Sequence, residues 1–294
     1  MGSLLRGVDC YREQLRRFAS RYRLPIFIAA ALGFFTGLYV SFRHIDLDFN
    51  TLSYGPFLMV IFITQPLLII LNSFELKLCA LASDAKMSLA ESVYISNSAT
   101  IANILPLPAG LVLRGAALIK GGGSLGLVGK VLLVAALMWI TIAMMVSGAV
   151  IASGFISAII LALGLLAVIL LTAYTARLCS FKIASGFLIT RVFMVGIMAV
   201  QLQLCFAILG HTIGISGAAA YVVSGVAGAV ISIVPAGLGI IEGTGALLAK
   251  LDGASPAQAY IVLSLNRIIG LGLAAISVVV FGCFQKRYIF GEEV

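Results

Sequence analysis

The chain has 294 residues, of which 62% are hydrophobic and only 10% are charged, and its formal net charge is +8 at pH 7. A water-soluble domain of this length could not bury so much apolar surface, so the composition excludes a soluble globular protein and indicates a chain that lies in a bilayer. The positive charge does not indicate a nucleic-acid partner, because the basic residues stand at the edges of apolar runs and not on a solvated face interleaved with aromatic side chains.

Apolar runs follow one another along almost the whole chain and predict membrane-spanning helices. Residues 1–23 carry six arginines and are not followed by a signal-peptide cleavage pattern, so we expect a basic cytoplasmic tail. We expect residues 24–294 to form a single transmembrane domain, made of helices because a helix satisfies its own backbone hydrogen bonds in lipid. A run of about 20 apolar residues can cross roughly 30 Å of hydrocarbon as a helix. The six expected spans are residues 24–42, 55–72, 126–150, 155–175, 183–210 and 257–284.

Two regions between these spans, residues 92–121 and 213–251, are interrupted by proline and glycine. The breaks are Pro106, Pro108 and Gly110 in the first region and Pro235, Gly237 and Gly239 in the second. The return arms, residues 111–121 and 238–250, reach only about 17 to 20 Å as helices, which is short of a full crossing. We therefore expect an all-α polytopic membrane protein with six spanning helices and two re-entrant helical hairpins. A bundle of eight helices is the alternative.

Lysine and arginine concentrate on one side of the predicted membrane. Because cytoplasmic loops are enriched in these residues, the arginine-rich tail places the amino terminus inside, and fourteen of the nineteen basic residues then lie on that side. With this assignment the first interrupted region begins and ends inside, whereas the second begins and ends outside. We expect a multi-pass protein of the bacterial inner (plasma) membrane with both termini in the cytoplasm. The mixed segment 74–91 is expected to lie along the cytoplasmic interface.

The two halves of the domain, about 24–150 and 155–284, share the order span, span, hairpin, span with opposite starting sides. The sequence Pro-Ala-Gly-Leu that begins at Pro108 recurs at Pro235, and each copy is followed by a small-residue helix that ends in lysine. Inverted repeats of this kind are typical of transporters, and their broken helices commonly line the substrate site. The alternative is that these prolines and glycines only kink packed helices.

Four ionisable residues fall within the predicted membrane segments, namely Arg114, Arg191, Glu242 and Arg267. An ionised side chain at the bilayer centre is costly unless it is paired or hydrated, so we expect all four to face the interior of the bundle. One interpretation is a structural ion pair between Glu242 and one arginine. The other is that three arginines against one carboxylate leave positive charge for a ligand, since planar guanidinium groups suit bidentate binding of phosphate. Asn97 and Asn103 are expected either to bind a head group or to hold helices together.

The residues around the two breaks resemble the signatures of the lysylphosphatidylglycerol synthase transmembrane-region family. Residues 235–242 look like the family's Pro-Gly-Gly-x-Gly-x-x-Glu, with Ala236 in place of one glycine. Residues 103–114 are similar to a family stretch that usually reads Pro-x-Arg-x-Gly-Glu-x-x-Arg, with Pro108 in place of the arginine and Leu111 in place of the glutamate. These departures remove two charges from the polar cluster that the family has at this place.

The resemblance implies a flippase-like membrane domain that translocates or handles lipids, and Arg267 matches an arginine that is usual in the family's last helix. Our first hypothesis is a translocator that passes an anionic, phosphate-bearing lipid or a polyprenyl-phosphate-type glycolipid between leaflets by alternating access. The alternative is a non-transporting accessory subunit, whose partners would be glycosyltransferases or other enzymes of lipid or envelope polysaccharide synthesis.

A lipid-modifying membrane enzyme is the third hypothesis, and the sequence speaks against it. Glu242 is the only carboxylate placed within the predicted membrane segments, and no histidine accompanies it to form an acid–base pair. The five cysteines contain no close pair, and the chain has only two histidines. We therefore expect no catalytic residue, no metal site and no cofactor.

Overall fold

The computed structural model describes residues 25, 27–45, 52–104, 109–230, 237–251 and 253–289, with side chains as far as residue 282. The described residues are helical apart from short connections and contain no strand. Six of the helices are long and apolar enough to cross a membrane, which confirms the predicted spans and indicates a multi-pass membrane protein. They are Phe27–His44, Tyr54–Ala82, Leu125–Ile151, Gly154–Leu178, Phe181–Ile208 and Pro256–Gly282. The predicted basic tail, residues 1–23, lies outside the described residues.

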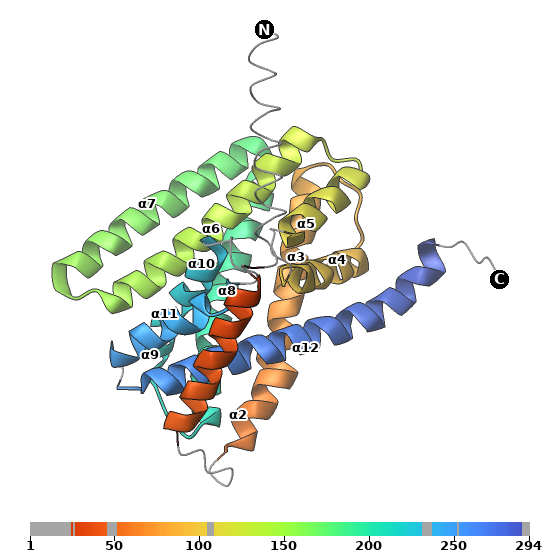
Figure 1. The fold of residues 1–294 in the computed structure, drawn as a ribbon. Helices are drawn as coiled ribbons and strands as arrows, with labels where there is room; N and C mark the ends of the chain where they lie inside the picture. Colours follow the sequence, from red (N-terminus) through yellow and green to blue (C-terminus); the bar gives the residue numbers. More distant parts are fainter. Residues whose placement is uncertain are drawn as a thin grey trace, which may run out of the picture.

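Figure 1 shows the arrangement of these helices. The second span consists of α2 (Tyr54–Met59), a π-helical turn (Val60–Thr64) and α3 (Gln65–Ala82). The π-helical turn ends two residues before Pro66, which has no N–H to donate to the carbonyl group one turn back. The other long helices are α6 (Leu125–Ile151), α7 (Gly154–Leu178), α8 (Phe181–Ile208) and α12 (Pro256–Ile289).

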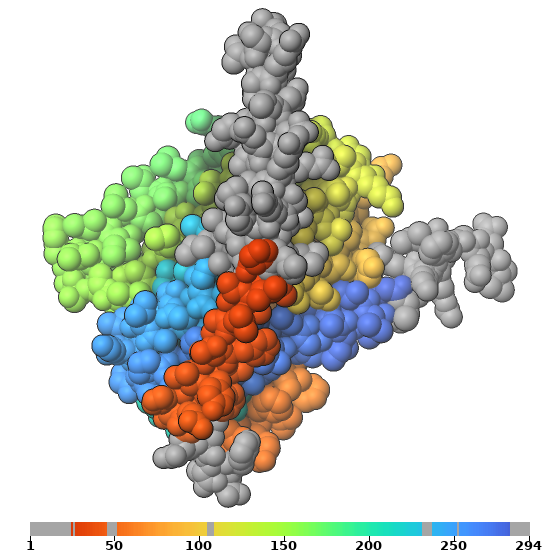
Figure 2. All heavy atoms as spheres, in the orientation of Figure 1, coloured from red at the N-terminus to blue at the C-terminus, as the bar shows by residue number. Residues whose placement is uncertain are grey.

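The outer surface of the bundle is apolar. In α7, which packs against α6 at one flank, only Val168 and Thr175 are buried, and leucine and isoleucine side chains cover its outer face. The helix Phe27–His44, red in Figure 2, lies on the outside over α12, where the Tyr260 hydroxyl donates to the Phe34 carbonyl oxygen at 3.1 Å. Apolar side chains that are exposed over this much surface are compatible with lipid and not with water.

The first interrupted region forms a helical hairpin of α4 (Leu89–Ala102) and α5 (Ala109–Lys120), which pack against each other. A capping box between Ser88 and Glu91 begins α4. Gly110 permits the close approach of the two arms, because a Cβ atom there would lie 2.5 Å from the Ala99 carbonyl oxygen. The predicted breaks Pro106 and Pro108 lie outside the described residues.

The second interrupted region contains α9 (Ile215–Ala220), α10 (Val222–Val230), α11 (Ile240–Leu248) and a 3₁₀ turn (Ala249–Leu251). Its arms also meet at a glycine: a Cβ atom on Gly237 would lie 2.7 Å from the Cα atom of Gly228. Gly237 has φ +64°, and Gly239, the N-cap of α11, has φ +77°, a region that glycine enters without strain. The predicted break Pro235 lies outside the described residues.

The helix connections gather at two ends of the bundle. At the first end, the Lys86 N–H donates to the Gly121 carbonyl oxygen at 2.8 Å, and the Cys179 thiol reaches the Ala82 carbonyl oxygen at 3.5 Å. At the second end, the Ser53 N–H donates to the Ile208 carbonyl oxygen at 3.1 Å. The 28-residue helix α8 runs from the first end to the second, so the two ends are about 42 Å apart.

The two hairpins open at these opposite ends. The connection before α4 is bonded to the connection after α5 at the first end, through Lys86 and Gly121. A small cavity of about 230 Å³ at the second end is lined by Gly214, before α9, and by Leu251, after α11. The connections that flank each hairpin therefore lie at one end of the bundle.

Candidate functional site

A polar cavity of about 510 Å³ lies between the two hairpins and the spans α3, α8 and α12. Six carboxamide side chains line it: Gln65, Asn72, Asn97, Asn103, Gln201 and Asn266. Arg267 is the charged residue of the lining, and apolar side chains and glycines make up most of the rest. Buried polar groups in a membrane protein usually mark a substrate or ion site, so this cavity is the candidate site.

Gln201 joins three helices at the cavity. Its Nε2 donates to Oε1 of Gln65 on α3 at 2.7 Å and to Oδ1 of Asn266 on α12 at 2.5 Å. The Gln201 side chain is buried, with 2% exposure, and its Oε1 has no hydrogen-bond partner among the described residues. A buried acceptor without a partner is costly and is often a place where a ligand or water binds.

Protein donors engage two further carboxamide oxygens of the cavity. Nη2 of Arg114 donates to Oδ1 of Asn72 at 3.1 Å, and the Gly110 N–H donates to Oδ1 of Asn103 at 3.0 Å. Four amide nitrogens of the lining donate to no described residue, namely those of Gln65, Asn72, Asn103 and Asn266. Asn97 has the opposite orientation, since its Nδ2 donates to the Val93 carbonyl oxygen at 2.8 Å, and no described residue donates to its Oδ1. The cavity therefore has more donors than acceptors.

Glu242 and Arg267 form an ion pair behind the cavity, with Oε1 and Nη1 3.3 Å apart. Glu242 is fully buried, and its Oε2 accepts from the Gly239 N–H at 2.9 Å in the first turn of α11. Nη2 of Arg267 donates to the Gly237 carbonyl oxygen at 3.3 Å, and its guanidinium lies 6.0 Å from the ring centre of Phe34. Arg267 thus holds the return arm of the second hairpin while it lines the cavity.

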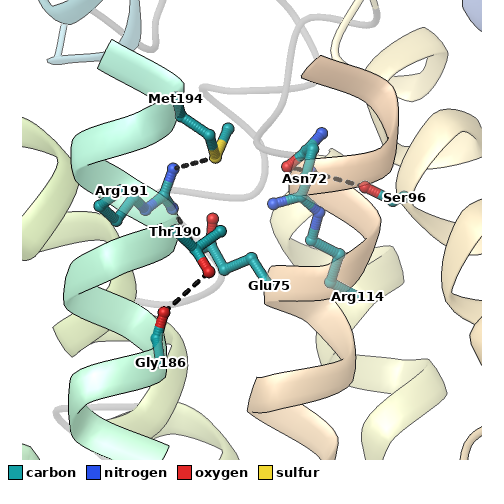
Figure 3. Close-up of polar contacts among 8 residues, drawn as sticks. All are labelled: Asn72, Glu75, Ser96, Arg114, Gly186, Thr190, Arg191 and Met194. Atoms are coloured by element: carbon teal, nitrogen blue, oxygen red, sulfur yellow. Dashed lines mark hydrogen bonds and ion pairs between the residues drawn. The ribbon is translucent and has the colours of Figure 1, made fainter. Parts of the chain in front are cut away.

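Glu75 is a second carboxylate within an apolar span, and it was not predicted from the sequence. It is buried on α3 and forms an ion pair with Arg191 of α8, and Figure 3 shows the two side chains directed toward one another. The expectation that residues 74–91 lie along the interface is wrong for this part, because α3 continues to Ala82 and carries Glu75 into the bundle. The expectation that Glu242 is the only carboxylate in the membrane segments is wrong for the same reason.

Arg114 has polar but uncharged partners. Its Nη2 contacts Asn72 and, at 3.5 Å, the Ser96 hydroxyl (Figure 3), and no carboxylate of the described residues pairs with it. Among the described residues of the interior, three arginines and two glutamates therefore leave one excess positive charge, whereas the sequence alone predicted two.

The predicted site residues divide by their place around the cavity. Arg267 and Asn103 line it, Glu242 holds Arg267 from behind, and Arg114 reaches it through Asn72. Arg191 does not line it and is engaged with Glu75. Four lining carboxamides were not predicted as site residues, namely Gln65, Asn72, Gln201 and Asn266. For Gln65 and Asn72 the signal was their spacing: together with Glu75 they recur at intervals of seven and three residues, which places all three on one face of α3.

Comparison with known proteins finds no matching family model, no matching curated protein and no matching solved structure. In the described ranges, no group of three histidine, cysteine, aspartate or glutamate side chains is placed to hold a metal ion. The fold and the site therefore define the class of protein in structural terms: an all-helical, multi-pass membrane protein with a carboxamide-lined cavity between two helical hairpins.

Proposed function

We propose that this chain is a lipid translocator, in which the head group of a phosphate-bearing lipid occupies the cavity between the hairpins. The observation that carries the proposal is the cavity itself, six carboxamides and one arginine inside a body whose outer surface is apolar. Its volume of about 510 Å³ falls in the range of roughly 300 to 1,000 Å³ that is usual for small-ligand sites. A lipid can present its head group to such a cavity while its chains stay in the bilayer.

The charge balance supports a head group with one negative charge. Arg191 and Arg267 each have a carboxylate partner, so they supply little net charge. Arg114 has none among the described residues, and its bond to Asn72 connects it to the cavity lining. One excess positive charge matches the single negative charge of a phosphodiester, and guanidinium and amide N–H groups are suitable donors to its oxygens.

An inverted repeat is part of the proposal. Gly110 and Gly237, which occupy the same place in the repeated Pro-Ala-Gly-Leu sequence, are 127 residues apart. Each is the residue at which the return arm of a hairpin touches the incoming arm. This agreement supports halves of about 24–150 and 155–284 that are related by a pseudo-two-fold axis.

The contacts between α3 and α8 support the same relationship. These helices are joined by two links, Gln65 with Gln201 and Glu75 with Arg191. With the 127-residue spacing of the repeat, the position equivalent to 65 is 192, beside Arg191, and the position equivalent to 75 is 202, beside Gln201. If a two-fold axis relates the halves, it places the Gln65–Gln201 link within one residue of the Glu75–Arg191 link. The two links are therefore approximate symmetry copies of each other.

Two hairpins that open at opposite ends supply the elements for alternating access. The return arm α5 has 12 residues and is about 18 Å long, which favours a re-entrant hairpin over a full crossing. We propose that the halves rock about the cavity and expose it to each leaflet in turn. The basic first end would face the cytoplasm of a bacterial inner membrane, with both termini on that side.

The resemblance to the lysylphosphatidylglycerol synthase transmembrane-region family is consistent with this proposal. The glutamate and the arginine that carry part of the resemblance, Glu242 and Arg267, are the buried pair beside the cavity. On the basis of these two residues we propose that the chain belongs to this family and has the lipid-translocating role that the family implies.

Lipid transfer between leaflets tests the proposed function. Vesicles that contain the purified protein and tail-labelled fluorescent phosphatidylglycerol are treated with a membrane-impermeant reductant, which destroys label only in the outer leaflet. The proposal predicts that label in the inner leaflet becomes accessible faster than in empty vesicles. No transfer for phosphatidylglycerol, phosphatidylethanolamine or a polyprenyl-phosphate lipid would favour the non-transporting accessory subunit.

A further inference from the structure

The ion pair between Glu75 and Arg191 lies between the cavity and the first end of the bundle. On α3 the cavity lining ends at Asn72, and Glu75 follows about one turn nearer the first end. On α8 the lining begins at Met194, and Arg191 precedes it by about one turn, again toward the first end. Both side chains of the pair are buried. Along these two helices, the pair therefore separates the cavity from the first end.

A second link between the same helices bounds the other side of the cavity. The hydrogen bond between Gln65 and Gln201 lies ten residues, or about 15 Å, from the ion pair on either helix. Helix α3 belongs to the first proposed half and α8 to the second. Because rocking halves must open the cavity on one side while the other side stays closed, the two links are placed as its two gates.

Arg114 is a second guanidinium beside the carboxylate of the ion pair. Its Nη2 donates to Oδ1 of Asn72 at 3.1 Å, and Asn72 precedes Glu75 by three residues on one face of α3. In Figure 3 the Glu75 side chain lies between Arg191 and Arg114, and the charges of Glu75 and Arg191 both act on Arg114. Arg114 is therefore placed as an alternative partner for Glu75.

The polar atoms around Glu75 outnumber the bonds that hold them. Its Oε1 is paired with Arg191, whereas its buried Oε2 has no hydrogen-bond partner among the described residues. The buried Nε of Arg114 has none among them either. One carboxylate beside two guanidinium groups allows either of two ion pairs, and each of them leaves one positive charge over.

We propose that the Glu75–Arg191 ion pair is the first-end gate of the cavity, and that Glu75 exchanges Arg191 for Arg114 when the gate opens. A buried carboxylate without a partner is costly, so the opening needs this replacement. Arg114 belongs to the same half as Glu75 and moves with it, while Arg191 becomes hydrated in the opened path. The proposal rests on the proposed function, because it assigns one of the two gates that alternating access requires.

Access of water to the cavity from the first end tests the gate without requiring transport. In a variant whose native cysteines are replaced by alanine, Met198→Cys places a thiol in the cavity lining, and a separate Lys86→Cys variant marks the exposed first end. An impermeant thiol reagent is added to inverted or to right-side-out membrane vesicles. The labelling rate of Met198→Cys, from the side that labels Lys86→Cys, measures how often the gate opens.

Arg114→Gln is the central variant, because it keeps the ion pair of the closed gate and removes only the second partner. We expect it to slow labelling from the first end about tenfold, since the open state then leaves Glu75 unpaired. Arg191→Gln should raise the rate about tenfold, since Glu75 can then pair only with Arg114. Lys120→Gln, on the same helix as Arg114, is the matched control and should leave the rate unchanged.

Three results would overturn the proposal. Labelling in Arg114→Gln that is as fast as in the wild type, or faster, would show that Arg114 does not stabilise the open state. This result does not depend on the folding of Arg191→Gln. An equal slowing by Arg114→Gln in a Glu75→Gln background would show that Arg114 does not act through Glu75. No labelling of Met198→Cys from the first end in any variant would show that no gate opens there.

Failure of the proposed function gives a different result. The expected rate changes together with no leaflet transfer would contradict only the translocator. Leaflet transfer together with labelling that does not respond to Arg114→Gln would contradict only the gate.

Discussion

Arg267 of α12 and Glu242 of α11 form an ion pair that joins the last span to the return arm of the second hairpin, with 3.3 Å between Nη1 and Oε1. The same guanidinium donates to the Gly237 carbonyl oxygen, where the two arms of the hairpin meet. The second hairpin can therefore move relative to α12 only if this ion pair breaks. Because Arg267 also lines the cavity, the pair connects the shape of the cavity to the position of the hairpin.

The Glu242→Gln variant should be strongly destabilised, because it leaves the buried guanidinium without its carboxylate. Removal of one partner of a buried pair costs about 3 to 5 kcal/mol. Denaturant unfolding in detergent micelles measures this change in the free energy of unfolding. The double variant Glu242→Gln/Arg267→Met should recover much of the loss, since it removes both charges. A single variant as stable as the wild type would show that the pair does not hold the hairpin.

Substitution of the hairpin glycines by alanine should destabilise the chain by about 1 to 3 kcal/mol, the usual effect of overpacking. In Gly110→Ala the new methyl group meets the Ala99 carbonyl oxygen, and in Gly237→Ala it meets the backbone of Gly228. Gly243→Ala on α11 is the matched control, because a methyl group there meets nothing within 4 Å. Thermal unfolding of the three variants checks this, and equal midpoints would contradict the close packing of both hairpins.

The charge of Arg114 should contribute to lipid binding through Asn72. We expect Arg114→Gln to lower the affinity for phosphatidylglycerol about tenfold, because the variant loses the excess positive charge of the interior. Lys120→Gln, at the exposed end of the same helix, removes an equal charge and should change the affinity little. Titration of both variants with the lipid in detergent makes the comparison. Equal losses would indicate a nonspecific effect of net charge.

Introduced cysteines should show that the hairpins open on opposite sides of the membrane. In a variant whose native cysteines are replaced by alanine, Lys86→Cys and Ser124→Cys flank the first hairpin, and Thr212→Cys and Gly253→Cys flank the second. An impermeant thiol reagent should label the first pair only from the cytoplasm and the second pair only from outside. Labelling of all four from one side, or of the two flanks of one hairpin from different sides, would contradict the proposed topology.

The sequence was sufficient to predict the six long apolar helices. Runs of about 20 apolar residues have few alternatives to spanning helices, and Gly110 and Gly237 lie where the arms of each interrupted region make close contact. The pairing of Glu242 with one arginine was one of the two interpretations considered, and the structure selects Arg267 as that partner. The distribution of lysine and arginine predicts that each interrupted region begins and ends on one side of the membrane, and cysteine labelling tests this prediction.

Glu75 and the carboxamides were not predictable in the same way. The end of α3 contains Glu75 and Lys77, and these charges lower the local hydropathy so that the span seemed to end at 72. A carboxamide in an apolar run can serve helix packing or line a cavity, and only the partner of each oxygen and nitrogen decides between these roles. That information depends on contacts between residues far apart in the chain, such as Gln65 with Gln201.

Leaflet transfer by two glycine variants of α12 tests most directly whether lipid passes through the cavity. Gly270 lines the cavity beside Gln65, whereas Gly272 is exposed on the outside of the helix with open space around it. We expect the wild type and Gly272→Leu to transfer phosphatidylglycerol between leaflets, and we expect no transfer by Gly270→Leu, which fills the cavity. Transfer by Gly270→Leu at the wild-type rate would contradict passage through this cavity, and transfer by the wild type no faster than in empty vesicles would contradict the translocator.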